Sequence, residues 1–188
     1  MRVVIDTSSL LSLVRYYLPF DKNQILYNLI ESKIKSGEII ILDKVYEECK
    51  YTSKGLVLKT INYLNDKRTR IKTEELLPTT KFFNQLENQF INGAIRNKLT
   101  EVEFENRKNA YLESADAKLL LYCLKNKNLF DRNLHIITEE TETSNDNKSF
   151  KKLPAICKIL DINVLTLPKL IYSYEEIDLI ISTNLKRH

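Results

Sequence analysis

The chain has 188 residues, of which 43% are hydrophobic and 29% charged, and its net charge is +4 at pH 7. This length and composition predict one globular domain with enough apolar residues for a buried core. The mild positive charge permits a polyanionic partner without identifying one. The three glycines are not clustered, which argues against a P-loop or a dinucleotide-binding loop.

Cys49, Cys123 and Cys157 lie far apart in apolar helical contexts, which predicts free, buried thiols in a reducing cytosol. The sequence has no C-x-x-C motif and only two histidines, so a zinc site is not expected. No stretch approaches the about 18 apolar residues of a membrane span, and the N-terminus lacks a signal-peptide pattern. We therefore expect a cytoplasmic protein without a membrane partner.

Strands and helices alternate along the chain, which predicts a parallel sheet covered by helices. The expected strands are the segments at 3–5, 39–42, 135–138 and 163–165, which are rich in valine, isoleucine and leucine. The expected helices cover 8–17, 23–36, 54–66, 115–127 and 175–185, with further helices beginning at Asp43 and Pro154.

Gly37 is expected to end the second helix, Asp43 to act as an N-cap, and Thr100 with Glu103 to form a capping box. The polar helical pattern between Pro78 and Leu112, with an apolar stripe beginning at Phe82, indicates a helical hairpin. We predict a single domain over 1–188 of the three-layer α/β/α class. It has a central parallel sheet and a helical insert at about 66–112.

Four acidic residues stand at or just after the ends of predicted strands or near helix starts. Asp6 ends the first strand, Glu48 lies on the helix after the second, and Glu140 follows the third. Asp116 begins an apolar helix, where an unpaired charge is costly, although the helix dipole alone also favours an acid there. Parallel strands end at one edge of the sheet, where α/β proteins bind ligands. The four acids are therefore expected to converge.

Four motifs occur in this order: Val-Val-Ile-Asp6-Thr-Ser, Val45-Tyr-Glu-Glu48-Cys, Ser114-Ala-Asp116-Ala and Ile-Ile-Thr138-Glu-Glu140. Together they resemble the PIN domain, a family of metal-dependent ribonucleases, over nearly the whole chain. The C-terminal part is similar to an uncharacterised bacterial subgroup of that family. The long segment between about 66 and 112 departs from the compact toxin-type members.

The resemblance implies catalytic and metal-binding roles for Asp6, Glu48, Asp116 and Glu140. It also implies that the hydroxyls of Ser8 and Thr138 orient Asp6 or a bound water. Glu47 competes with Glu48, and Glu139 competes with Glu140. The family's motif spacing favours Glu48 and Glu140.

Carboxylate oxygens of this kind select Mg²⁺ or Mn²⁺. One ion, or two ions about 4 Å apart, activates water and stabilises charge on a phosphodiester. The resemblance thus implies a Mg²⁺- or Mn²⁺-dependent endoribonuclease that acts on RNA, with the toxin of a toxin–antitoxin pair as one form. An antitoxin protein and a second copy of the chain are candidate partners.

Two basic clusters are candidate contacts for RNA phosphates, although each alone is also typical of a solvated surface. They are Lys67, Arg68 and Arg70, and Lys148, Lys151 and Lys152. Two other classes remain open. A catalytically degenerate PIN-like binding module is compatible with Glu140 in place of Asp. A phosphoacceptor receiver-like domain also has acids at strand ends, but it pairs them after the first strand, where this chain has Asp6-Thr-Ser.

Overall fold

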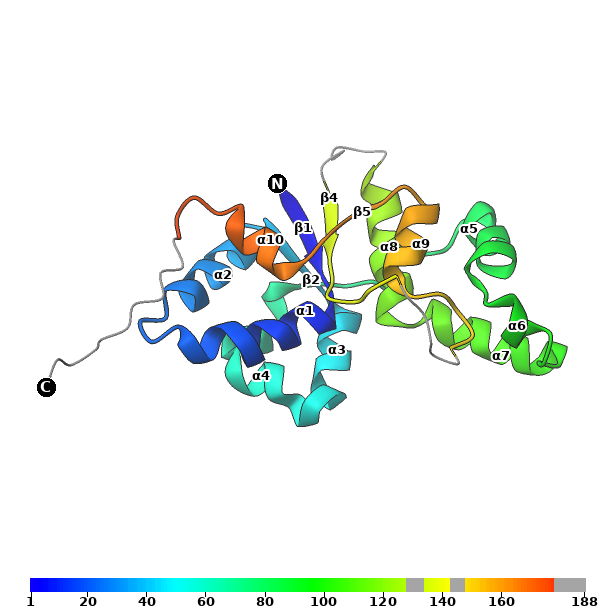
Figure 1. The fold of residues 1–188 in the computed structure, drawn as a ribbon, viewed down its shortest axis with the longest axis horizontal. Helices are drawn as coiled ribbons and strands as arrows, with labels where there is room; N and C mark the ends of the chain where they lie inside the picture. Colours follow the sequence, from blue (N-terminus) through cyan, green and yellow to red (C-terminus); the bar gives the residue numbers. More distant parts are fainter. Residues whose placement is uncertain (128–133, 143–147, 178–188) are drawn as a thin grey trace, which may run out of the picture.

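The computed structural model describes residues 1–127, 134–142 and 148–177 (Figure 1). Its centre is a five-stranded, all-parallel sheet in the order β3-β2-β1-β4-β5. The strands are β1 (Arg2–Ile5), β2 (Ile39–Leu42), β3 (Arg70–Ile71), β4 (Leu134–Ile137) and β5 (Asn163–Leu165). The chain builds from β1 outward to β3 and then returns to the other side of β1 with β4. The prediction of an α/β fold with a parallel sheet is confirmed.

The central strands are apolar at successive positions because helices cover both faces of the sheet. All four residues of β2 are buried, as are Val3, Val4 and Ile5 of β1. In register, Val4 lies between Ile40 of β2 and Ile136 of β4. Two-sided burial explains why the sequence shows continuous apolar runs rather than alternation.

The helices outside the insert alternate with the strands. They are α1 (Thr7–Ser12), η1 (Leu13–Tyr17), η2 (Leu18–Phe20), α2 (Ile25–Lys35), α3 (Asp43–Tyr51), η3 (Thr52–Gly55), α4 (Leu56–Thr60), η4 (Asn62–Asn65), α8 (Ala115–Lys127), α9 (Leu153–Ile159) and α10 (Leu167–Tyr172). The predicted helix 115–127 has the observed bounds. The predicted helix 175–185 is wrong at 175–177, which are not helical, and its remainder lies outside the described residues.

The predicted helix 54–66 is also wrong as a continuous element. Ser53, Lys54 and Gly55 all have positive φ, so the chain leaves the right-handed helical region before α4 begins. At Ile61 the backbone leaves the helical region again, and η4 follows. The apolar periodicity of this segment does not reveal these two breaks.

The predicted helix ends agree in part with the structure. Gly37, with φ of +76°, follows the end of α2 as expected, and Thr100 and Glu103 form the predicted capping box. Asp43 is not the N-cap of α3 but its first residue. Its carboxylate instead accepts hydrogen bonds from the hydroxyl and the backbone N–H of Thr73, at 2.6 and 3.2 Å. Asp43 therefore anchors the turn after β3.

The predicted insert is more varied than a helical hairpin. It contains η5 (Lys67–Thr69), β3, α5 (Thr80–Gln85), η6 (Leu86–Phe90), α6 (Gly93–Arg96) and α7 (Glu101–Leu112). Its apolar stripe is buried at Phe82, Leu86 and Phe90, whereas Phe83 is only half-buried. The strand β3 pairs with the end of β2 and is too short for a periodic pattern to reveal.

The three cysteines are free and buried, as predicted. Among the helices described, none combines the length and the apolar character that crossing a membrane requires.

Candidate acidic site

The carboxyl ends of β1 and β4 lie side by side where the strand order reverses direction. The backbone N–H of Asp6 donates to the carbonyl of Ile137 at 2.9 Å, so the residues that follow the two strands start as neighbours. In parallel α/β sheets, this reversal point opens a crevice between the loops. Asp6 and Thr138 are both buried at this position.

The carboxylate of Asp6 is held by three donors although it is only 4% exposed. Its Oδ2 accepts from the hydroxyls of Ser8 at 2.6 Å and Thr138 at 2.9 Å. Its Oδ1 accepts from the backbone N–H of Thr7 at 2.7 Å. Hydrogen bonds of this kind compensate the desolvation of a buried charge. Ser8 and Thr138 thus have the contacts expected of residues that orient Asp6.

The turn after β4 wraps around the same hydroxyls. The backbone N–H of Glu139 donates to Ser8 Oγ at 3.0 Å, and that of Glu140 donates to Thr138 Oγ1 at 3.2 Å. Each hydroxyl therefore accepts one bond from the turn and donates another to Asp6. This arrangement fixes the backbone on which Glu140 is carried.

The structure distinguishes Glu48 from Glu47. Glu48 Oε2 accepts a hydrogen bond from the Thr7 hydroxyl at 2.7 Å, which joins α3 to the residue next to Asp6. Glu47 forms an exposed ion pair with Lys50 at 2.7 Å. Successive residues of a helix point in different directions, so α3 directs only Glu48 towards Asp6. Sequence reasoning missed the linking role of Thr7.

The structure also separates Glu140 from Glu139. Glu139 Oε1 accepts from the backbone N–H of Leu167, the first residue of α10, at 2.6 Å. Glu140 Oε2 accepts from the backbone N–H of Leu153, the first residue of α9, at 3.3 Å. Glu139 is thereby engaged with α10, a role that sequence reasoning missed because α10 follows 28 residues later.

Asp116 experiences the combined charge of the other three acids. Burial raises its pKa to about 7, and the negative charges of Asp6, Glu140 and Glu48 contribute to the rise. Burial likewise raises the pKa of Glu48, with further contributions from Asp6 and Glu140, while the Thr7 hydroxyl opposes the rise. The structure therefore brings the four predicted acids into one electrostatic neighbourhood, in which like charges disfavour ionisation.

The donor chemistry of this neighbourhood fits a hard divalent cation. All four side chains offer carboxylate oxygens, the ligands that Mg²⁺ and Mn²⁺ prefer. Within 1–127, 134–142 and 148–177, no three acidic, histidine or cysteine side chains are grouped closely enough to hold an ion as they stand. Drawing the carboxylates together costs repulsion between like charges, which a cation offsets.

The two basic clusters differ in their relation to the acids. The charge of exposed Lys148 lowers the pKa of both Glu48 and Asp116, whereas the cluster at 67–70 is engaged elsewhere. There, Arg68 pairs with Asp66 at 2.6 Å, and the Arg70 guanidinium lies 3.5 Å from the ring centre of Tyr46.

Tyr111 is a further residue of this neighbourhood that sequence reasoning missed. Its hydroxyl is buried and has no hydrogen-bond partner in the described part of the chain. Burial raises the pKa of the phenol well above its usual range, and the charges of Asp116 and Glu140 add to the rise. No sequence signal marks this residue, because an aromatic side chain at helical spacing predicts only packing.

Fold and site together define an α/β protein that carries four carboxylates where the order of a five-stranded parallel sheet reverses. Residues 3–176 match the family described as Domain of unknown function (DUF4411). This match spans most of the chain, and the protein belongs to that family. No curated protein matches the chain.

Proposed function

We propose that the protein is a Mg²⁺- or Mn²⁺-dependent ribonuclease of PIN-like type, with Asp6, Glu48, Asp116 and Glu140 as metal-binding and catalytic residues. The observation that carries the proposal is the position of Asp116. It is a half-buried acid whose pKa is raised by burial, with further contributions from the charges of the other three. Strongly perturbed carboxylates at a strand-order reversal are typical of functional sites.

The chain's own residues have distinct tasks in this proposal. Ser8 and Thr138 hold the Asp6 carboxylate in a fixed direction through their hydrogen bonds. The Thr7 hydroxyl, next to Asp6 in the chain, holds the side chain of Glu48 by a hydrogen bond. A bound Mg²⁺ or Mn²⁺ would supply an activated water and stabilise negative charge on the scissile phosphate. Lys148 is placed to attract the phosphate backbone of RNA.

The test is cleavage of total RNA with Mn²⁺ by matched pairs of variants. Glu48→Gln and Glu140→Gln should each lower the rate about 10²-fold or more, because each removes a charged ligand worth several kcal/mol. Glu47→Gln and Glu139→Gln, one residue away, should keep near wild-type rates. Cleavage that persists equally in Asp116→Asn would identify a contaminating nuclease and contradict the proposal.

We also propose a cytoplasmic site of action, in keeping with three free thiols. An antitoxin protein and a second copy of the chain remain the proposed protein partners. RNA binding without cleavage by any preparation would favour the degenerate binding module instead. Transfer of phosphate from acetyl phosphate to Asp6 would favour the receiver-like alternative.

A further inference from the structure

We infer that the helical insert α5–α7 positions residues 148–152, the basic segment, beside the acidic site, so that its lysines contact the phosphates of RNA. The identity of the polyanion rests on the proposed function. The positioning itself rests on contacts between the insert, the basic segment and Glu140.

Backbone pairing joins the basic segment to the insert. Ile91 and Phe150 form an isolated antiparallel β-bridge. The N–H of Asn92 donates to the carbonyl of Ser149, and the N–H of Lys151 donates to the carbonyl of Phe90, both at 2.8 Å. Backbone bonds on both sides of Phe150 leave its neighbours little freedom to turn. The lysine side chains are therefore presented in a defined register.

Side chains of α7 hold the same segment. The guanidinium of Arg107 donates to Ser149 Oγ at 2.6 Å. The ring of Tyr111 lies against that of Phe150, with centroids 4.5 Å apart and planes inclined by 32°. Stacked aromatic pairs of this kind add stabilisation beyond the area they bury. This packing explains why the Tyr111 hydroxyl is buried although it has no hydrogen-bond partner among the described residues.

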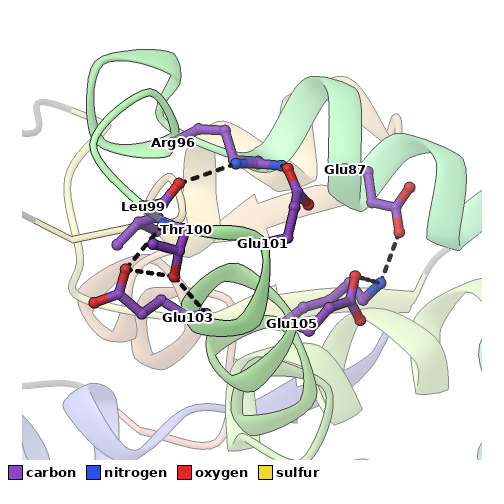
Figure 2. Close-up of polar contacts among 8 residues, drawn as sticks. Glu87, Arg96, Leu99, Thr100, Glu101, Glu103 and Glu105 are labelled. Atoms are coloured by element: carbon purple, nitrogen blue, oxygen red, sulfur yellow. Dashed lines mark hydrogen bonds and ion pairs between the residues drawn. The ribbon is translucent and has the colours of Figure 1, made fainter.

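The insert is itself cross-linked by ion pairs, which Figure 2 shows together with the capping box at the start of α7. Arg96 of α6 pairs with Glu101 of α7 at 2.5 Å. Lys108 of α7 bridges Glu87 of η6 at 2.8 Å and Glu105 at 2.7 Å. A side-chain network links η6, α6 and α7, so the insert offers the basic segment a common support.

The other end of the basic segment meets the acidic site. Leu153, which directly follows the segment, donates its N–H to Glu140 Oε2 at 3.3 Å. Lys148 is exposed, and its charge acts on Glu48 and Asp116. The segment therefore runs from the insert to Glu140, and the charge of Lys148 acts on the same group of acids.

The experiment measures binding of a fluorescent single-stranded RNA 12-mer by anisotropy, over a series of salt concentrations with EDTA present. Lys148→Gln should raise Kd and reduce the slope of log K against log salt by about 0.7, the value for one phosphate contact. Phe150→Ala should reduce the slope at least as much, although it removes no charge. Their combination should lose less than the sum of the two effects, because a displaced Lys148 no longer contributes.

Two variants serve as controls. Lys22→Gln removes one exposed charge next to α2, on the other side of the molecule from α9, and should leave the slope unchanged (Figure 1). Ser149→Ala removes the acceptor of Arg107 and no charge; it should reduce the slope of log K against log salt while the protein stays folded. If Phe150→Ala does not fold, the slope measured for Ser149→Ala tests the inference on its own.

The inference would be overturned if the losses in the double variant are additive. It would also be overturned if the slope is unchanged in Ser149→Ala while Phe150→Ala either has an unchanged slope or does not fold. Wild-type protein that does not bind the RNA would overturn it as well. Because EDTA prevents metal-dependent cleavage, the result is independent of nuclease activity. Failure of the ribonuclease proposal is read separately, from the Mn²⁺ assay.

Discussion

At the scale of single residues, the site combines contacts that the sequence suggests with contacts that it hides. The PIN-domain resemblance implies that the hydroxyls of Ser8 and Thr138 orient Asp6, and both hydroxyls do hydrogen-bond to its carboxylate. The bond from Thr7 to Glu48 and the contact of Glu139 with α10 depend on how distant elements pack. Neighbouring acids therefore cannot be assigned from local sequence alone.

The raised pKa of Asp116 makes stability depend on pH. An acid whose pKa is higher in the native state binds its proton more tightly there, so stability falls as pH rises from about 4 to about 7. Asp116→Asn should remove this fall and, above pH 7, stabilise the protein by up to about 4 kcal/mol. Urea unfolding of both proteins between pH 4 and 8, with EDTA present, measures the pH dependence of the unfolding free energy. An unchanged pH profile would contradict the expectation, and Glu47→Gln is the control.

At the scale of elements, predictability follows the length and burial of each segment. β2 is a continuous apolar run, β1 and β4 are short apolar segments with one polar residue each, and α8 shows one unbroken pattern, so the sequence predicts their positions well. The two residues of β3 give no pattern, and they become a strand only by pairing with β2. The breaks around α4 are changes of backbone conformation at Ser53 to Gly55 and at Ile61, which hydrophobic periodicity does not reveal.

Gly55 and Gly93 form a matched pair for testing the break before α4. Gly55 has φ of +73°, and an added Cβ would lie 3.2 Å from the carbonyl of Lys50. Gly55→Ala should therefore cost about 1–2 kcal/mol of unfolding free energy. At Gly93, in α6, an added Cβ would meet nothing within 4 Å, so Gly93→Ala should be neutral or slightly stabilising. Equal losses in urea unfolding would show that the φ of Gly55 is not the cause.

At the scale of the whole molecule, the strand order decides where chemistry is placed. The four acids come from α3, α8 and the ends of β1 and β4, and only the reversal at β1 and β4 brings them into one neighbourhood. The parallel sheet and the convergence of acids at its edge were therefore predictable from the alternation of elements. The fine arrangement of the carboxylates depends on packing that the alternation does not specify.

Metal binding should stabilise the complete fold by mass action. At Mg²⁺ or Mn²⁺ concentrations of about 100 times Kd, the wild type should gain about 2.7 kcal/mol, with a matching rise in Tm. Asp6→Asn should lose most of this gain, whereas Asp161→Asn, an exposed change far along the chain, should keep it. Thermal unfolding with and without the ion measures the difference, and equal gains in both variants would exclude a site at Asp6.

The hydrogen bond between Asp6 and Thr138 joins residues 132 positions apart. Closing so long a loop is entropically costly before the contact forms, and folds that depend on such contacts fold slowly. During synthesis, β1 leaves the ribosome well before its neighbour β4, because β2, β3 and the insert lie between them. The nascent protein therefore carries β1 with one edge unpaired, and Asp6 without its Thr138 partner, until β4 has emerged.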